Sequence, residues 1–308
     1  MGKFINPFSD WGFKMLFGQE INKDLLISFL NDLLEGEHHI ADITFKDKEQ
    51  LPDTETMRGI IYDIYCVTDQ GERFIVEMQN RYQEHFVDRS LYYISRAIVQ
   101  QGVKGCWDYK LLPVYTVCFM NFNLTNFTPQ KFRTDIALMD MKEKKVFSDN
   151  VRLIYLMLPL FQKEEDECET NFERWIYILK HMSTFERMPF LARNAVFKKL
   201  ADIADVSALS REEREKYDES IKAMRDYIAV MNGAKIEGHR EGFNEGRVEG
   251  RAEGRAEGRA EGRVEGRAEG RDERSLEIAK MMLEAGETIE KIKMFTGLSE
   301  QAIMDCRQ

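Results

Sequence analysis

The sequence predicts an α/β domain in which helices flank a mixed central sheet. Residues 62–80 alternate apolar and polar side chains with period two, which is typical of a β-hairpin. Residues 88–102 carry apolar side chains at helical spacing, and residues 111–120 are apolar almost throughout, as buried central strands are. The order helix, strand, hairpin, helix, strand indicates a mixed sheet between helices.

Two helices are expected before the hairpin. The first opens in the segment SDWGFK, where Ser9 or Asp10 can cap it. Lys14 lies one turn into this helix, from where its side chain could reach over the sheet. The second helix is the apolar segment LLISFLNDLL, residues 25–34.

The register of the hairpin follows from its apolar positions. One face is wholly apolar if the two strands contribute Tyr62, Ile64 and Cys66, and Phe74, Val76 and Met78. A slip by one residue would turn this whole set to the other face, so the pairing is strongly specified and requires a loop of odd length. Asp69, Gln70 and Gly71 supply such a loop, with glycine where a positive φ is often needed. Asp63 then lies directly opposite Glu77.

The second face of the hairpin gathers Asp63, Glu77 and Gln79 at one end. Like charges opposite each other are unfavourable, so a half-covered Asp and Glu pair needs a bridging cation, a shared proton or a nearby Lys or Arg. Carboxylate oxygens are hard ligands and favour Mg²⁺ or Mn²⁺. The alternative is that this face is the solvent side of a hairpin, where these residue types are ordinary.

The rest of the sheet follows the hairpin. In the helix of residues 88–102, apolar side chains recur at Leu91, Ile94, Ile98 and Val99. Arg89 opens this helix soon after the hairpin, where a phosphate contact is reasonable. An arginine paired with an acid, and a tyrosine from this helix in the core, are the alternative. Residues 132–159 read as two strands around a charged turn, completing or edging the sheet.

Composition bounds the class of protein. A chain of 308 residues with 43% hydrophobic content can bury one large domain and a smaller one. No signal peptide is visible and no apolar run approaches the roughly 20 residues of a membrane span, so a cytoplasmic protein without a membrane partner is expected. The net charge of −10 argues mildly against a non-specific DNA binder, although a local basic patch remains open. Nucleophile elbows, phosphate loops and CxxC or HExxH metal motifs are absent.

Five segments, taken in order, resemble the PD-(D/E)XK nuclease family transposases, also called recombination-promoting nucleases. They are FSDWGFKMLFG, LLISFLNDLL, FIVEMQ, RSLYYISRAIVQQG and LLPVYTVCFMNF, and the resemblance spans about residues 4 to 160. It implies a PD-(D/E)XK (restriction-endonuclease-like) core and metal-dependent hydrolysis of DNA. By position, Asp63 and Glu77 would be ligands of Mg²⁺ or Mn²⁺, and Gln79 would be catalytic where the superfamily most often has lysine.

The glutamine is a departure with chemical consequences. A lysine can orient the attacking water and steady charge on the phosphate, whereas Gln79 offers only neutral hydrogen bonds. Either glutamine suffices or another cation substitutes, and Lys14 is the candidate, with a solvated helix residue as the alternative. Asp10 is either a helix cap or a third metal ligand. The resemblance places an arginine of the family at Arg89, and Tyr93 is the second candidate DNA contact.

The chain is expected to have four parts. Residues 1–165 form the nuclease-like domain, 166–235 a helical domain, 236–274 a region of EGRA or EGRV repeats and 275–308 a small helical tail. On a helix, a four-residue period makes slowly drifting stripes of Gly, Arg and Glu. An isolated helix of this sequence should have low stability, because like charges meet at i,i+4 and each Gly costs about 0.8–1 kcal/mol relative to Ala. A helix that self-associates into a homo-oligomer is favoured, with a flexible charged linker as the alternative.

The tail contains a Thr-Gly-Leu-Ser turn between amphipathic helices, which is similar to helix-turn-helix modules. Its last helix lacks several basic residues, so packing or dimerisation is favoured over DNA reading.

Two functions of different classes remain. The first is a metal-dependent DNA endonuclease linked to recombination or mobile elements, as the resemblance implies. The second is an inactive nuclease-like oligomeric scaffold that binds nucleic acid or regulates a partner, which Gln79 and the acidic balance permit.

Overall fold

The computed structural model describes residues 2–37, 39–50, 59–124, 131–191 and 193–306. The chain forms two compact units, Met1–Tyr227 and Ile228–Gln308. The first unit holds the sheet and its flanking helices, and the second is helical.

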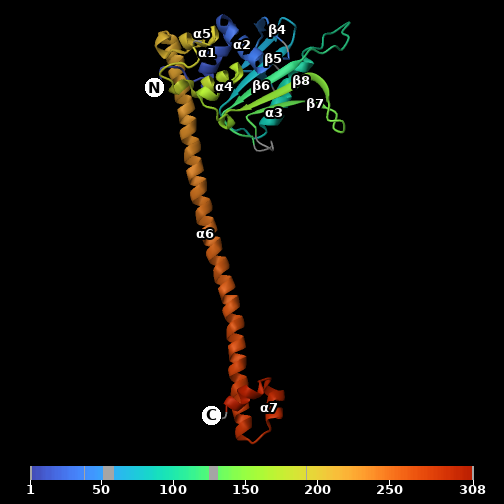
Figure 1. Ribbon diagram of the computed structural model, residues 1–308, viewed down its shortest axis with the longest axis vertical. Helices are drawn as coiled ribbons and strands as arrows, with labels where there is room; N and C mark the ends of the chain where they lie inside the picture. The colour runs from blue at the N-terminus through green and yellow to red at the C-terminus, as the bar shows by residue number, and fades with distance from the viewer. Residues whose placement is uncertain (1, 38, 51–58, 125–130, 192, 307–308) are drawn as a thin grey trace. The chain divides into compact units, whose positions relative to one another are not determined.

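The central sheet of the first unit is mixed, as predicted, and has six strands in the described residues (Figure 1). In sheet order these are β1 (Ile43–Phe45), β4 (Ile64–Thr68), β5 (Arg73–Gln79), β6 (Val114–Met120), β8 (Val146–Met157) and β7 (Arg133–Met139). β5, β6 and β8 run parallel, while the outer pairs are antiparallel. The apolar run at β6 is therefore a central strand, buried at every position. A separate small sheet pairs β2 (Glu49–Gln50) with β3 (Ile60–Ile61).

Helices cover both faces of the sheet. The helices of one face are α1 (Asp10–Phe17), α2 (Lys23–Leu33), α4 (Asn171–His181) and α5 (Ala195–Ala204). They share one hydrophobic cluster with inward-facing strand residues such as Phe74 and Phe119. α3 (Phe86–Val99) covers the other face, where Ile94 packs in a second cluster with Ile75. Short 3-10 helices connect these elements: η1 (Glu20–Asn22), η2 (Leu158–Leu160), η3 (Glu165–Glu167), η4 (Met182–Thr184) and η5 (Val206–Ala208).

The helix α3 begins earlier than predicted. Its buried residues are Phe86, Ser90, Ile94 and Ala97. Of the apolar residues whose spacing predicts this helix, Leu91 and Val99 are exposed, at 45% and 65%. Small side chains instead face the sheet, where the Ser90 hydroxyl makes a hydrogen bond with the hydroxyl of Tyr155.

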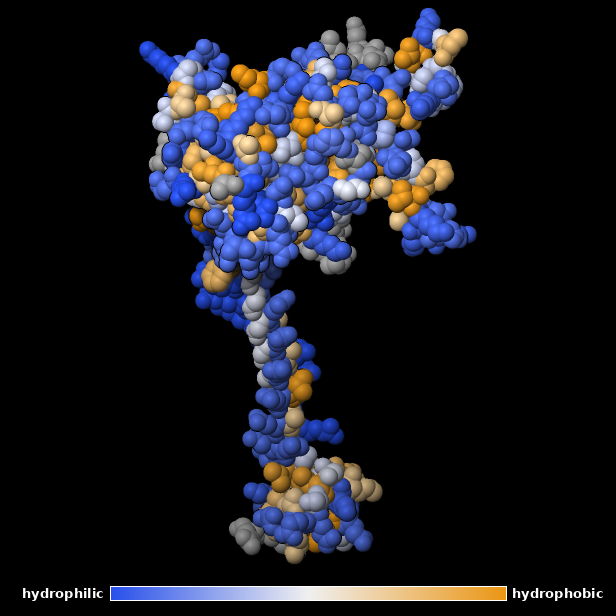
Figure 2. All heavy atoms as spheres, turned by 45° about the horizontal axis from the view of Figure 1, so that its top comes forward, coloured by the Kyte–Doolittle hydropathy of each residue, from blue (hydrophilic) through white to orange (hydrophobic). Residues whose placement is uncertain are grey.

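The repeat is helical. It lies within α6 (Arg211–Glu284), a continuous helix of 74 residues. Every residue from 237 to 271 is exposed, and Figure 2 shows mostly hydrophilic side chains along it. A Cβ built on any repeat glycine from Gly238 to Gly270 meets no atom within 4 Å. Packing within this chain therefore does not require the glycines.

The second unit has a small core of its own. The end of α6, α7 (Ile289–Thr296) and α8 (Glu300–Asp305) meet around Ala279, Ile292 and Ile303, all fully buried. Gly297 ends α7 with a φ of 74°, and Ser299 caps α8 by accepting from the backbone N–H of Ala302. In the described part of the chain, no helix combines the length and apolar character that a membrane span would need.

Candidate active site

The hairpin β4–β5 has the register predicted from its apolar positions. Ile64 pairs with Val76 and Tyr65 with Ile75, so the next residues outward, Asp63 and Glu77, lie opposite each other. The loop is the expected one, with Gly71 at a φ of 87°. This register places the two carboxylates at the end of β5.

Tyr62 departs from the predicted face. The residue lies between β3 and β4, outside regular strand structure, so the alternation of the hairpin does not extend to it. Its ring packs in the second cluster against Tyr65 and Tyr93, at centroid distances of 5.1 and 5.5 Å. The phenol donates a hydrogen bond to the backbone carbonyl of Tyr93 at 3.1 Å, which holds the ring on the α3 side of the sheet.

Backbone amides tie the two carboxylates together. The N–H of Asp63 donates to Oε1 of Glu77 at 3.2 Å, and the N–H of Met78 donates to Oδ2 of Asp63 at 2.9 Å. The side-chain amide of Gln79 donates to Oε2 of Glu77 at 3.2 Å. These donors are neutral, so they orient both carboxylates without compensating their charge.

Burial makes that charge costly. Glu77 is 3% exposed and Gln79 is 7% exposed, so this end of the hairpin is not its solvent side. Burial, together with the charge of Asp63, raises the pKa of Glu77 to about 8. Burial also raises the pKa of Asp63. The pair therefore prefers a shared proton or a bound cation to two bare charges.

The helix α1 brings two further predicted residues toward this pair. Ser9 is the cap, because its hydroxyl accepts from the backbone N–H of Gly12 at 3.0 Å. Asp10 is the first helical residue, and its carboxylate accepts from Lys14 Nζ at 2.5 Å. Burial has the largest effect on the pKa of Asp63 and raises it; the charge of Lys14 lowers this pKa, and the charge of Asp10 raises it further. Capping thus does not account for Asp10.

The helix α3 contributes the second cation. The charge of Arg89 opposes the burial that raises the pKa values of Asp63 and Glu77. Its guanidinium donates to the side-chain carbonyl of Gln83 and lies 4.9 Å from the ring centroid of Tyr93. The structure therefore brings Asp63, Glu77, Gln79, Asp10, Lys14 and Arg89 together, with Tyr93 behind the arginine.

Comparisons with known proteins place the chain in a family. A family model described as PD-(D/E)XK nuclease family transposase matches residues 7–234. The chain belongs to this family. A second model, described as the C-terminal HTH domain of the Rpn/YhgA-like nuclease family, matches residues 272–308. No curated protein and no solved structure shows a significant match to the chain.

The HTH match adds to what the tail alone indicated. In this PD-(D/E)XK transposase family member, the matched residues contain the end of α6, α7 and α8, and the Thr-Gly-Leu-Ser turn lies between α7 and α8. Residues 272–306 carry eight acidic and four basic side chains, and α8 carries no basic one. Because residues 272–306 are acidic overall, they attract DNA phosphates less than a helix-turn-helix domain usually does.

The donor set at the hairpin fits a divalent cation held by two carboxylates. The described residues contain no group of three or more His, Cys, Asp or Glu side chains arranged for a metal. Mg²⁺ needs fewer protein ligands than that, because it commonly keeps several waters and uses one or two carboxylates together with substrate phosphates. Asp63 and Glu77 would supply these carboxylates, and no salt bridge within the described residues engages either of them.

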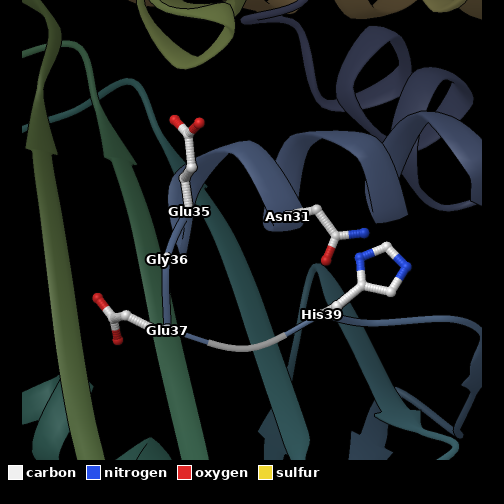
Figure 3. A pocket seen from close by; sticks show the side chains of 5 residues that line it. All are labelled: Asn31, Glu35, Gly36, Glu37 and His39. Atoms are coloured by element: carbon white, nitrogen blue, oxygen red, sulfur yellow. The ribbon is translucent and has the colours of Figure 1, made fainter.

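A hollow elsewhere in the first unit does not have this chemistry. It has a volume of about 380 Å³ and is lined by Asn31, Glu35, Gly36, Glu37 and His39 (Figure 3). The Asn31 side chain makes hydrogen bonds with both backbone groups of Ile40, so its role there is structural. Glu35 and Glu37 point away from Asn31 and His39 in Figure 3, and the set does not converge on one point.

Sequence reasoning missed Asn80 and Arg81, which follow the motif strand directly. Asn80 Nδ2 donates to the backbone carbonyl of Phe8, just before α1. Arg81 lies with its guanidinium 3.7 Å from the ring centroid of Tyr227. The sequence signal that could have identified them is their position, as two polar residues directly after the strand that carries Glu77 and Gln79.

Proposed function

We propose that this chain is a divalent-metal-dependent DNA endonuclease of the PD-(D/E)XK type, acting in recombination or on mobile elements. The observation that carries the proposal is the pair of half-buried Asp63 and buried Glu77, whose charge Lys14 and Arg89 oppose at longer range. A stable fold gains nothing from a buried carboxylate facing a half-buried one with only neutral donors, whereas a metal site needs such a pair.

The chain's own residues have distinct parts in this proposal. Asp63 and Glu77 would hold Mg²⁺ or Mn²⁺, which when bound polarises a phosphoryl oxygen and makes a nearby water more acidic. Gln79 fixes the Glu77 carboxylate through its amide. Lys14 supplies the positive charge that lysine supplies at the glutamine position in most of the superfamily. Arg89 binds a DNA phosphate, and Tyr93 holds the guanidinium in place by a cation–π contact.

Cleavage of supercoiled plasmid tests the proposal. Purified protein is incubated with plasmid and Mg²⁺ or Mn²⁺, beside Asp63→Ala and Glu77→Ala, with an excess of EDTA as the metal-free arm. Glu84→Ala is the matched control, because this exposed glutamate lies in the loop after the same strand. Nicking by the wild type and Glu84→Ala alone is expected. Equal nicking by all variants, or no nicking by the wild type, would contradict the proposal that this chain is an endonuclease.

A second candidate function is a nuclease-like scaffold without catalysis. The specific observation in its favour is Gln79, a neutral residue already engaged with Glu77. The scaffold predicts DNA binding that persists in Asp63→Ala and no nicking with either metal.

We also propose that the repeat joins copies of this chain. A Cβ added at any repeat glycine would meet no atom of this chain within 4 Å, so the missing side chains leave room for the backbone of another chain to approach. Along the repeat, arginine and glutamate each recur every fourth residue, so the arginine stripe of one helix can lie against the glutamate stripe of another.

A further inference from the structure

The first turns of α6 dock on the segment that carries Lys14. Side chains spaced three or four apart form one face of this helix: Tyr217, Ser220, Ile221, Met224 and Tyr227, called here the docking face. Tyr217 and Ile221 are each 5% exposed and belong to the same hydrophobic cluster as α1. Beyond Tyr227 the helix has no such face over residues 228–274, all of which are exposed.

Polar contacts fix the beginning of α1 to this face. The backbone N–H of Asn6 donates to the Tyr217 hydroxyl at 2.9 Å. The backbone N–H of Trp11 donates to the Ser220 hydroxyl at 3.2 Å. Trp11 lies in the first turn of α1, where backbone N–H groups have no partner within the helix, so Ser220 satisfies a donor that α1 itself cannot. The Trp11 ring also packs on Tyr217, with centroids 5.8 Å apart.

The end of the motif strand is fixed to the same assembly. Asn80, the residue after Gln79, donates to the carbonyl of Phe8 in the segment before α1. Arg81 stacks on Tyr227 of the docking face at 3.7 Å. The two parts of the candidate site, α1 and the end of β5, are thus joined to each other and to α6.

We propose that the docking face of α6 is a positioning element for the candidate site, with Tyr217 and Ser220 as positioning residues that act through Lys14. They hold the beginning of α1 so that the Lys14 charge reaches Asp63 and the DNA phosphate beside it. The inference rests on the proposed function and assigns to α6 a part in catalysis in addition to carrying the repeat.

A structural role alone would also be consistent with burial of the docking face, and a double-mutant cycle separates the two. Tyr217→Phe and Ser220→Ala remove single hydroxyls and leave the packing intact. Together they are expected to lower kcat for plasmid nicking about 5–20-fold, with KM and Tm nearly unchanged. In a Lys14→Met background, the same pair is expected to change kcat less than 2-fold, because coupled residues are non-additive. Tyr177→Phe, at another buried tyrosine of the same cluster, is the matched control and should leave kcat unchanged in both backgrounds.

An equal fold-loss in both backgrounds, or a loss that follows Tm, overturns the inference. Hydrogen exchange provides a readout that does not need cleavage. Faster exchange of backbone amides in residues 6–16 is expected for the Tyr217→Phe, Ser220→Ala protein and not for Tyr177→Phe. If the wild type nicks no plasmid, the proposed function fails while exchange still tests the docking face, and unchanged exchange in these residues overturns it.

Discussion

The backbone amide of Asp63 donates a hydrogen bond to the carboxylate of Glu77 at 3.2 Å across the β4–β5 hairpin. This bond orients the glutamate toward the aspartate, although two negative charges there repel each other. The hairpin therefore maintains an arrangement that costs stability in the metal-free protein, and this cost can be measured.

Replacing Glu77 by glutamine is expected to stabilise the metal-free protein while abolishing cleavage. The folded-state pKa of Glu77 is raised to about 8, so its contribution to stability is full below about pH 4.5 and is lost as the pH rises toward 8. Glutamine cannot ionise, so the Tm advantage of Glu77→Gln should grow across this window. Each kcal/mol gained raises Tm by about 2–4 °C for a unit of this size.

Thermal melts in EDTA from pH 4.5 to 8.5 measure this advantage. Glu84→Gln is the control, since its side chain is exposed and lies in the loop after the same strand. A Tm advantage of Glu77→Gln that stays constant or shrinks as the pH rises would contradict the conclusion that ionised Glu77 lowers the stability of the metal-free protein.

Gln79→Lys is expected to retain or raise nicking activity. The lysine ammonium would lie where the glutamine amide now donates to Glu77, adding a positive charge beside the carboxylate pair. Single-turnover nicking rates measure the effect, and Gln79→Met controls for loss of the amide. Complete loss of activity in Gln79→Lys would show that the role given to this position is wrong.

Lys14→Met is expected to lower kcat about 10–100-fold with little effect on Tm, since charge stabilisation of this kind typically contributes that much or more. Lys14→Arg should recover part of the rate. Lys199→Met is a suitable control, because Lys199 likewise forms an exposed ion pair, with Asp24, on the same face of the sheet. Activity that survives Lys14→Met unchanged would leave the lysine as an ordinary solvated helix residue.

Arg89→Ala is expected to weaken DNA binding and to reduce the slope of log K against log salt by about 1, as loss of one phosphate contact should. Binding is measured with Asp63→Asn protein so that DNA stays intact. Arg133→Ala serves for comparison, because Arg133 is already paired with Asp135 on the edge strand β7. An unchanged salt slope would contradict the phosphate contact.

A peptide of residues 237–271 is expected to gain helix as its concentration rises, measured by circular dichroism. Replacing its glycines with alanine should raise helicity in dilute solution, because each change favours helix by about 0.8–1 kcal/mol, but should block close approach of backbones. The alanine peptide would then lose the concentration dependence. A persistent coil signal from the natural peptide at all concentrations would rule out self-association.

Much of the fold was predictable because its central elements are simple patterns. The hairpin register required only period-two alternation and an odd loop, and the structure has both. Tyr62 escaped this reasoning because an aromatic residue suits either face, and the break in the strand before Ile64 leaves no mark in the alternation. In α3, apolar spacing selected Leu91 and Val99, whereas Ser90 and Ala97 fit closer to the sheet because they are small.

The geometry of the candidate site was predictable only where neighbouring strands set it. Asp63 and Glu77 face each other through pairing of neighbouring strands, which sequence can specify. The contacts of Asn6 with Tyr217 and of Trp11 with Ser220 join residues more than 200 positions apart. They use backbone donors and single hydroxyls, which leave no periodic pattern to detect.

The hydrogen bond from Asn6 to Tyr217 also bears on how the protein is made, since it joins residues 211 positions apart. Translation at about 5–20 residues per second leaves roughly 10–40 s between synthesis of the two partners. Throughout that interval α1 is present on the nascent chain without the helix that holds its beginning. A chain that ends before residue 217 lacks the hydroxyl that accepts from Asn6, so in such a chain this bond does not hold the beginning of α1, the helix that carries Lys14.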